Sequence, residues 1–161
     1  MIAVELARAL RTAGLRWHPR SGDAFVIETL ERAGEPGAAG EVFTVSEMTA
    51  EVHEFPSGTL IGFNGTTEWA LDSVDLADTL WLPREDQLRE ILRDGFRSLT
   101  AEQLPGEPGE ESLTLYVVTA LIRGRSRRFE AESAVDAYAE AVLDLIVQSL
   151  VSDSPDSSDS E

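Results

Sequence analysis

The chain is 161 residues long, 42% of them hydrophobic, and carries a formal net charge of −17. That length suits one domain, or two small halves that share a core, and the hydrophobic content suffices for a packed interior. The acidity argues against binding nucleic acid or an anionic membrane. The absence of cysteine excludes disulfides and thiolate sites.

No segment of the sequence reads as a signal peptide or a membrane span. Glu5 interrupts the first apolar stretch, and no cationic region precedes an apolar core there. The longest apolar stretch, Ala134–Val151, contains Asp136, Glu140 and Asp144, which is too much charge for a bilayer-spanning helix. We therefore expect a cytoplasmic protein.

The first half of the chain is predicted to form one helix followed by strands. Ile2–Ala13 has the spacing of an amphipathic helix that Gly14 ends. Ala24–Leu30 is expected to be a strand, and Asp72–Asp78 a connector. Residues 42–71 are predicted to form an antiparallel meander, with strands at Val42–Val45, Met48–His53, Thr59–Phe63 and Thr66–Leu71 and a hairpin turn at Asn64–Gly65.

Residues 81–92 contain the clearest helix start in the chain. Pro83 is favoured at the first helical position, because its missing N–H has no helical partner there. An apolar stripe with helical spacing follows at Leu88, Ile91 and Leu92. We expect Trp81 and Leu82 to fix the start of this helix against the body of the protein, and Gly95 to end it.

The last third repeats the pattern of strands followed by a helix. Phe96–Leu104 is a predicted strand, and Leu113–Ile122 is apolar on both faces, which is typical of a central, covered strand. Arg123–Ser126 is expected to turn the chain into a strand at Arg127–Ala131. Ser133 suits the N-cap of a last helix that reaches about Leu150.

This order of helix, strands, helix, strands and helix predicts an α+β fold, with antiparallel sheet and about three helices packed on one face. We interpret residues 1–151 as a single domain, or as halves 1–80 and 81–151. Residues 152–161 contain only Ser, Asp, Pro and Glu, so we expect a disordered acidic tail there.

Short motifs in the second half resemble a known group of proteins. WLPREDQL at Trp81–Leu88, followed by strands and then FEAES at Phe129–Ser133 before an alanine-rich helix, resembles small bacterial proteins similar to the phage ABA sandwich domain. Leu15–Asp23 and Phe63–Trp69 resemble segments of such proteins from actinobacteria and firmicutes. Over about residues 81–150 the resemblance implies a helix, a short antiparallel sheet and a closing helix. It assigns no catalytic residue.

Few side chains in the sequence are candidates for catalysis or metal binding. His18 and His53 have no second histidine at ligand spacing, and Glu51 is the acidic residue on the same strand face as His53. Glu68 and Asp72 are the candidate acid–base pair, with Asn64 orienting a substrate. The alternative interpretation makes these carboxylates solvated charges at a strand and its end.

One basic cluster stands out in this acidic chain: Arg123, Arg125, Arg127 and Arg128. Guanidinium forks match carboxylate and phosphate oxygens, so the cluster is a candidate site for a small anion or an acidic partner. The alternative is a solvated hairpin tip. Four further residues are candidates for a pocket or an interface, with the core as the alternative for the tryptophans: Trp17, Asn64, Trp69 and Trp81.

The sequence lacks the motifs of P-loops, nucleophile elbows, zincins, EF-hands and dinucleotide-binding folds. We therefore predict a non-enzymatic, protein-binding accessory or regulatory module without a cofactor or a metal. One alternative is a carboxylate-based hydrolase that uses Glu68 and Asp72. Another is an acidic mimic of nucleic acid that binds a basic protein.

Overall fold

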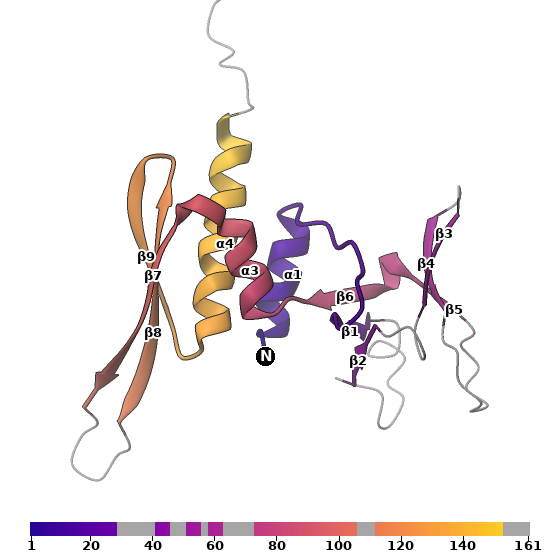
Figure 1. Ribbon diagram of the computed structural model, residues 1–161, viewed down its shortest axis with the longest axis horizontal. Coiled ribbons are helices and arrows are strands. Elements are labelled where there is room, and N and C mark those ends of the chain that lie inside the picture. The colour runs from indigo at the N-terminus through magenta and orange to yellow at the C-terminus, as the bar shows by residue number, and fades with distance from the viewer. Residues whose placement is uncertain (29–40, 46–50, 56–57, 63–72, 106–111, 153–161) are drawn as a thin grey trace, which may run out of the picture. The chain divides into compact units, whose positions relative to one another are not determined.

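The computed structural model describes residues 1–28, 41–45, 51–55, 58–62, 73–105 and 112–152 (Figure 1). Within these residues the chain is α+β, with three α-helices and small antiparallel sheets, so the predicted class and the antiparallel pairing are confirmed. The chain divides into two compact units. We call Arg16–Arg84 the sheet unit, and Met1–Leu15 together with Glu85–Glu161 the helical unit.

The described helices are α1 (Val4–Thr12), α3 (Glu85–Leu92) and α4 (Ala134–Ser152), with 3-10 turns η1 (Leu76–Asp78) and η2 (Arg93–Gly95). The strands are β1 (Ala24–Ile27), β2 (Val42–Thr44), β3 (Glu51–Phe55), β4 (Gly58–Gly62), β5 (Ser73–Asp75), β6 (Thr79–Leu82), β7 (Phe96–Leu104), β8 (Leu113–Ile122) and β9 (Arg125–Ala131). The bounds predicted for β7 and β8 agree residue for residue. Helix α4 includes Ser152, the first residue of the predicted tail; the rest of that tail, like the predicted strand Thr66–Leu71, lies outside the described residues.

In the sheet unit, the strands pair differently from the predicted meander. β1 lies between β2 and β6, so that Val26 pairs with both Val42 and Leu80. β3, β4 and β5 form a separate sheet in that order. The antiparallel pairing of β3 with β4 is confirmed. The meander over residues 42–71 is wrong as a whole, because β2 and β3 join different sheets, and Ser73–Asp75 is a strand rather than a connector. The three consecutive buried residues Phe25–Ile27 explain why β1 takes a central position.

A buried carboxylate holds the start of the sheet unit together. Asp23 is 2% exposed, and its Oδ2 accepts hydrogen bonds from Trp17 Nε1 and from the Arg20 amide, both at 2.9 Å. Arg84 Nη1 lies 3.5 Å from Asp23 Oδ1 and donates to the Gly22 carbonyl at 2.8 Å. One side chain thus joins a turn, an aromatic ring and the last residue of the unit.

Aromatic rings fill the core beside this carboxylate. The Trp17 ring lies 5.4 Å from the Phe25 ring and stacks on the Trp81 ring at 6.4 Å, with an angle of 3° between the planes. Phe25 in turn stacks on Phe43 at 5.7 Å. Trp17 and Phe43 pack against the buried residues Phe25, Ile27 and Val45. This cluster gives the sheet unit its own hydrophobic core.

Helix α3 begins at Glu85, so the prediction that Pro83 opens it is wrong. Trp81 and Leu82, predicted to fix the helix start, belong to strand β6 and pair with Phe25 and Ala24. The pairing holds the backbone extended up to Pro83, which itself disfavours helix in the residue before it.

The predicted helix end at Gly95 is also wrong. Arg93, with φ 48°, is the left-handed residue after α3, and Gly95 lies within the 3-10 turn η2. A Cβ on Gly95 would lie 3.0 Å from the Leu121 carbonyl oxygen. Glycine is therefore needed at this position for close packing of η2 on β8 rather than for its φ.

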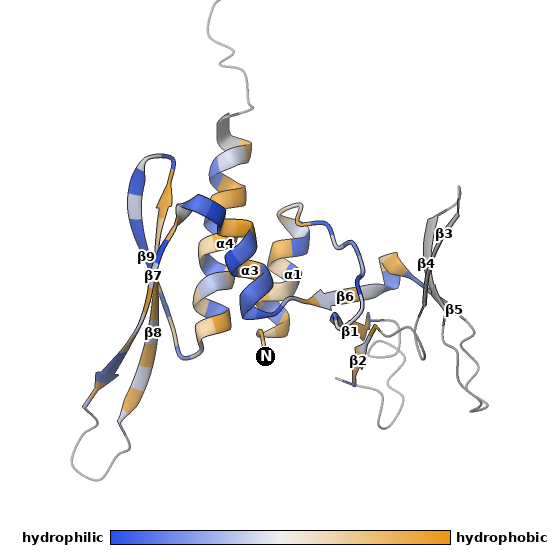
Figure 2. Cartoon of the chain, viewed as in Figure 1, coloured by the Kyte–Doolittle hydropathy of each residue, from blue (hydrophilic) through white to orange (hydrophobic). Residues whose placement is uncertain are grey.

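In the helical unit, the strands form a sheet in the order β7-β8-β9. Helix α4 packs on β8 and β9, and α1 and α3 pack on α4. Figure 1 shows α4 between the sheet and the other two helices, and Figure 2 shows hydrophobic residues along both β8 and α4. The first half of α4 is buried on several sides, at Val135, Ala137, Tyr138, Ala139, Ala141 and Val142.

The start of α4 confirms the predicted cap. Ser133 Oγ accepts a hydrogen bond from the Asp136 amide at 3.2 Å and donates one to Asp136 Oδ2 at 2.6 Å. Asp136 Oδ1 also accepts from the Ala3 amide at 2.8 Å, which fixes the start of α1. None of the described helices combines the length and the apolar character needed to cross a bilayer.

Replacing Asp23 by alanine should lower the free energy of unfolding of the sheet unit by about 2–4 kcal/mol, because Trp17, Arg20 and Arg84 lose a shared buried acceptor. Urea unfolding followed by tryptophan fluorescence measures this, since all three tryptophans of the chain belong to this unit. Asp78→Ala, in the same unit, is the control and should change stability by less than about 0.5 kcal/mol. Equal effects of the two substitutions would contradict a central role for Asp23.

Candidate functional site

The turn between β8 and β9 sets the direction of the arginine side chains. Ile122 pairs with Arg125, so Arg123 and Gly124 alone form the turn, with φ values of 52° and 75°. Two successive left-handed residues are typical of a type I′ turn, whose twist matches that of antiparallel strands. Because side chains alternate along a strand, Arg125 and Arg127 then lie on one face of β9 and Arg128 on the other.

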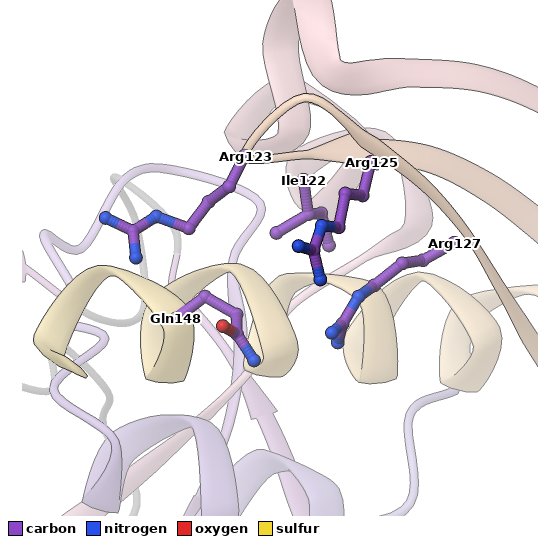
Figure 3. Close-up of a pocket in the computed structure, with 5 residues that line it drawn as sticks. All are labelled: Ile122, Arg123, Arg125, Arg127 and Gln148. Carbon is purple, nitrogen blue, oxygen red and sulfur yellow. The ribbon is translucent and has the colours of Figure 1, made fainter. Parts of the chain in front are cut away.

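Arg123, Arg125 and Arg127 line a pocket together with Ile122 and Gln148 (Figure 3). The pocket has a volume of about 450 Å³. Figure 3 shows the arginine side chains extending from the hairpin over helix α4, which carries Gln148 on the side that faces them. Two elements of one unit therefore supply the lining of this site, which we call the arginine pocket.

Of the three arginines in the pocket, one has an acidic partner within the described chain. Arg127 Nη1 donates to Asp144 Oδ1 at 2.6 Å, and the Asp144 side chain is only 19% exposed. Gln148 Nε2 lies 3.5 Å from the same oxygen. Arg123 and Arg125 are exposed and form no ion pair with any described carboxylate. Among the described residues, the three guanidinium groups of the pocket and the one carboxylate paired with them leave a surplus charge of +2.

Asp144 and Gln148 were not predicted as site residues. They are four apart on α4 and thus lie on the same side of the helix, one turn above the other. The available signal was a row of polar residues at four-residue spacing along α4, formed by Asp136, Glu140, Asp144 and Gln148. Nothing in the sequence shows which strand such residues face, so their meeting with Arg127 depends on the tertiary fold.

Arg128 lies outside the pocket, so the predicted four-arginine cluster divides into three and one. Its Nη2 pairs with Glu102 at 3.2 Å and with Glu130 at 3.1 Å, and all three side chains are about half exposed. The strand register places these three on the face of the sheet that carries Val117, which is 2% exposed. The ion pairs thus cover an apolar residue on the side away from α4.

That side of the β7-β8-β9 sheet also exposes leucines, and we call it the outer face. Leu104 and Leu113 pair across β7 and β8, and each is 43% exposed. Leu121, further along the same face of β8, is 37% exposed. The predicted central position of β8 is confirmed. The prediction that both of its faces are covered is wrong within the described chain, because Leu113 and Leu121 are exposed on the outer face.

The remaining candidates from the sequence fall in two groups. Trp17 and Trp81 lie in the aromatic cluster of the sheet unit, where Trp81 Nε1 is buried without a hydrogen-bond partner in the described residues. The others lie outside the described residues, so the acid–base pair and its neighbours stay predictions: Asn64, Glu68, Trp69 and Asp72.

The two histidines belong to the sheet unit. His18 is exposed in the sheet unit, and His53 belongs to strand β3. In the part of the chain that the structure describes, no three side chains of His, Asp or Glu come together as a metal-binding group. The arginine pocket and the outer face are the features on which a functional interpretation can be based.

Two side chains on α4, Tyr138 and Glu140, have pKa values raised above their ordinary values. Burial raises the pKa of Tyr138, while Arg89 lowers it and Glu85 raises it to smaller extents. Burial, and then the charge of Asp136, raise the pKa of Glu140. A raised pKa of a carboxyl group means that the fold disfavours its charged form, so ionised Glu140 costs stability at neutral pH.

Comparison of the chain with protein-family models, curated proteins and solved structures finds no match. The resemblance of residues 81–150 to the ABA sandwich domain therefore stays a prediction. Function has to be inferred from the geometry of the arginine pocket and the outer face.

Glu140→Gln should raise the free energy of unfolding at pH 7, because it removes a carboxylate whose charged form is disfavoured in the fold. Below the raised pKa, Glu140 becomes protonated in the folded state and its charge no longer costs stability. The gain should therefore shrink as the pH falls from this raised pKa toward the ordinary value of 4.5. Urea unfolding followed by far-UV circular dichroism at pH 7 and pH 4 checks the sign. Glu90→Gln, at an exposed position of α3, is the control. A loss of stability at pH 7 would refute the prediction.

Proposed function

We propose that this chain is a non-enzymatic protein-binding module that docks a partner on the outer face of the β7-β8-β9 sheet. The observation that carries this proposal is the exposed cross-strand pair of Leu104 and Leu113, each 43% exposed. Exposed apolar clusters rimmed by polar groups commonly mark protein interaction sites. Here the rim consists of Glu102, Arg128 and Glu130, which pair with one another.

The position of the two leucines supports docking rather than simple exposure. β9 ends at Ala131, opposite Tyr116, so the part of β8 before Tyr116 is hydrogen-bonded to β7 alone within the described sheet. Two-stranded ribbons are marginally stable in water without a surface to pack on. A partner that covered the leucines would contribute up to about 1.5–3 kcal/mol for each side chain fully buried, and would also stabilise the ribbon.

Charge indicates the chemistry of the partner. Among the described residues of the outer face, Glu102, Glu130 and Arg128 carry a net charge of −1, and the whole chain carries −17. The surface therefore suits a protein segment with apolar side chains flanked by lysine or arginine. A second copy of this chain is disfavoured as occupant because it would bring another 17 negative charges.

Photo-crosslinking in native lysate tests this proposal, with the photoreactive residue placed at Leu113 or, as the control, at Leu150. Leu150 is 56% exposed on α4, away from the outer face. We expect a crosslinked partner from position 113 only. Leu104→Ser in the Leu113 crosslinking variant should reduce the yield about tenfold, because apolar contact area is lost.

Equal crosslinking from positions 113 and 150 would contradict the outer face as the docking surface. A crosslinked product with the mass of two copies of this chain would contradict a basic heterologous partner. Far-UV circular dichroism of each variant confirms that a lost crosslink does not result from unfolding.

A further inference from the structure

The arginine pocket lies on the opposite face of the same sheet from the proposed docking surface. We propose that it is a binding site for a small organic phosphomonoester, with Arg123 and Arg125 as the groups that bind the phosphate. This inference does not depend on the proposed function, because it uses different residues on a different face.

Charge balance favours a phosphate over a single carboxylate. The pocket has a surplus of +2, since Asp144 offsets one of its three arginines. A phosphomonoester carries close to two negative charges at neutral pH, whereas a monocarboxylate carries one. Guanidinium groups also donate pairs of hydrogen bonds that match the oxygens of a phosphate. A phosphate dianion therefore matches the surplus charge of +2 that the described residues give the pocket.

Arg123 and Arg125 differ from Arg127 in whether a described carboxylate forms an ion pair with them. Arg127 is occupied by Asp144 at 2.6 Å, whereas Arg123 and Arg125 form no ion pair within the described residues. The two-residue turn fixes the backbone of Arg123 beside Arg125. Their guanidinium groups are thus available to a ligand, and Arg127 forms a fixed wall of the pocket.

Size and lining favour a small organic molecule rather than a bare ion. About 450 Å³ lies within the range of small-molecule sites and leaves room for a carbon skeleton beside the phosphate. The lining includes Ile122, which is only 2% exposed, and the side chain of Gln148 from α4 (Figure 3). In the view of Figure 3, Ile122 and Gln148 lie between Arg123 on one side and Arg127 on the other.

Titration of the full-length protein with ethyl phosphate at constant ionic strength tests the proposal, with backbone amide chemical shifts as the readout. We expect saturable shifts at Gly124, Arg125 and Gln148, and an affinity at least tenfold higher than for acetate. Inorganic phosphate should bind more weakly than ethyl phosphate, because it makes no contact with the apolar atoms of the pocket lining.

The variants Arg123→Gln and Arg125→Gln should each weaken ethyl phosphate binding at least tenfold, the loss typical of a hydrogen bond to a charged group. Arg128→Gln is the matched control, since it removes one positive charge from the same strand on the opposite face and should change the affinity less than twofold. Arg125→Lys keeps the positive charge but loses the paired hydrogen-bond donors of the guanidinium group. Its affinity for ethyl phosphate should therefore lie between those of the wild type and Arg125→Gln.

Several results would overturn the proposal. They are the absence of saturation, acetate binding as tight as ethyl phosphate, and a loss in Arg128→Gln equal to that in Arg125→Gln. A phosphoserine peptide that binds at least tenfold more tightly than ethyl phosphate would also overturn it, because the phosphate would then belong to a protein rather than to a small molecule.

Discussion

The packing of α4 against β8 and β9 is the constraint on which the rest of the helical unit depends. Ala137, Ala139 and Ala141 are completely buried, and their small side chains let the helix lie close to the elements around it. This packing covers one face of the sheet and holds the β8–β9 turn over the second half of α4. It also leaves the outer face open to solvent. Both the arginine pocket and the exposed leucines are consequences of that arrangement.

Local charge and net charge have opposite signs in this protein. The chain carries −17 in total, yet the arginine pocket has a surplus of +2. At physiological ionic strength, interactions between exposed charges are screened beyond about 8 Å. A small anion in the pocket therefore senses Arg123 and Arg125 more strongly than distant carboxylates. The overall acidity would still slow the approach of anions and favour that of cationic partners.

The positions of helices and strands could be predicted from the sequence better than the strands and helices that they pair or pack with. Apolar runs and the cap at Ser133 predicted β7, β8 and α4, because these signals are local. The neighbours of β1 could not be predicted, since an apolar run indicates burial and not the strand it pairs with. The basic cluster was also visible in the sequence. Its division was not, because the turn at Arg123–Gly124 decides which alternate positions face α4 and hence Asp144.

The contact between Asp136 and the Ala3 amide implies an order of events during synthesis. Helix α1 precedes the sheet unit in the chain, but helix α4, on which it packs, lies beyond residue 84. The sheet unit is continuous in sequence and is complete before α3 and α4 exist. Helix α1 is marginal by itself, being only nine residues long. Helix α1 is therefore made before the sheet unit but must settle into its final place after it.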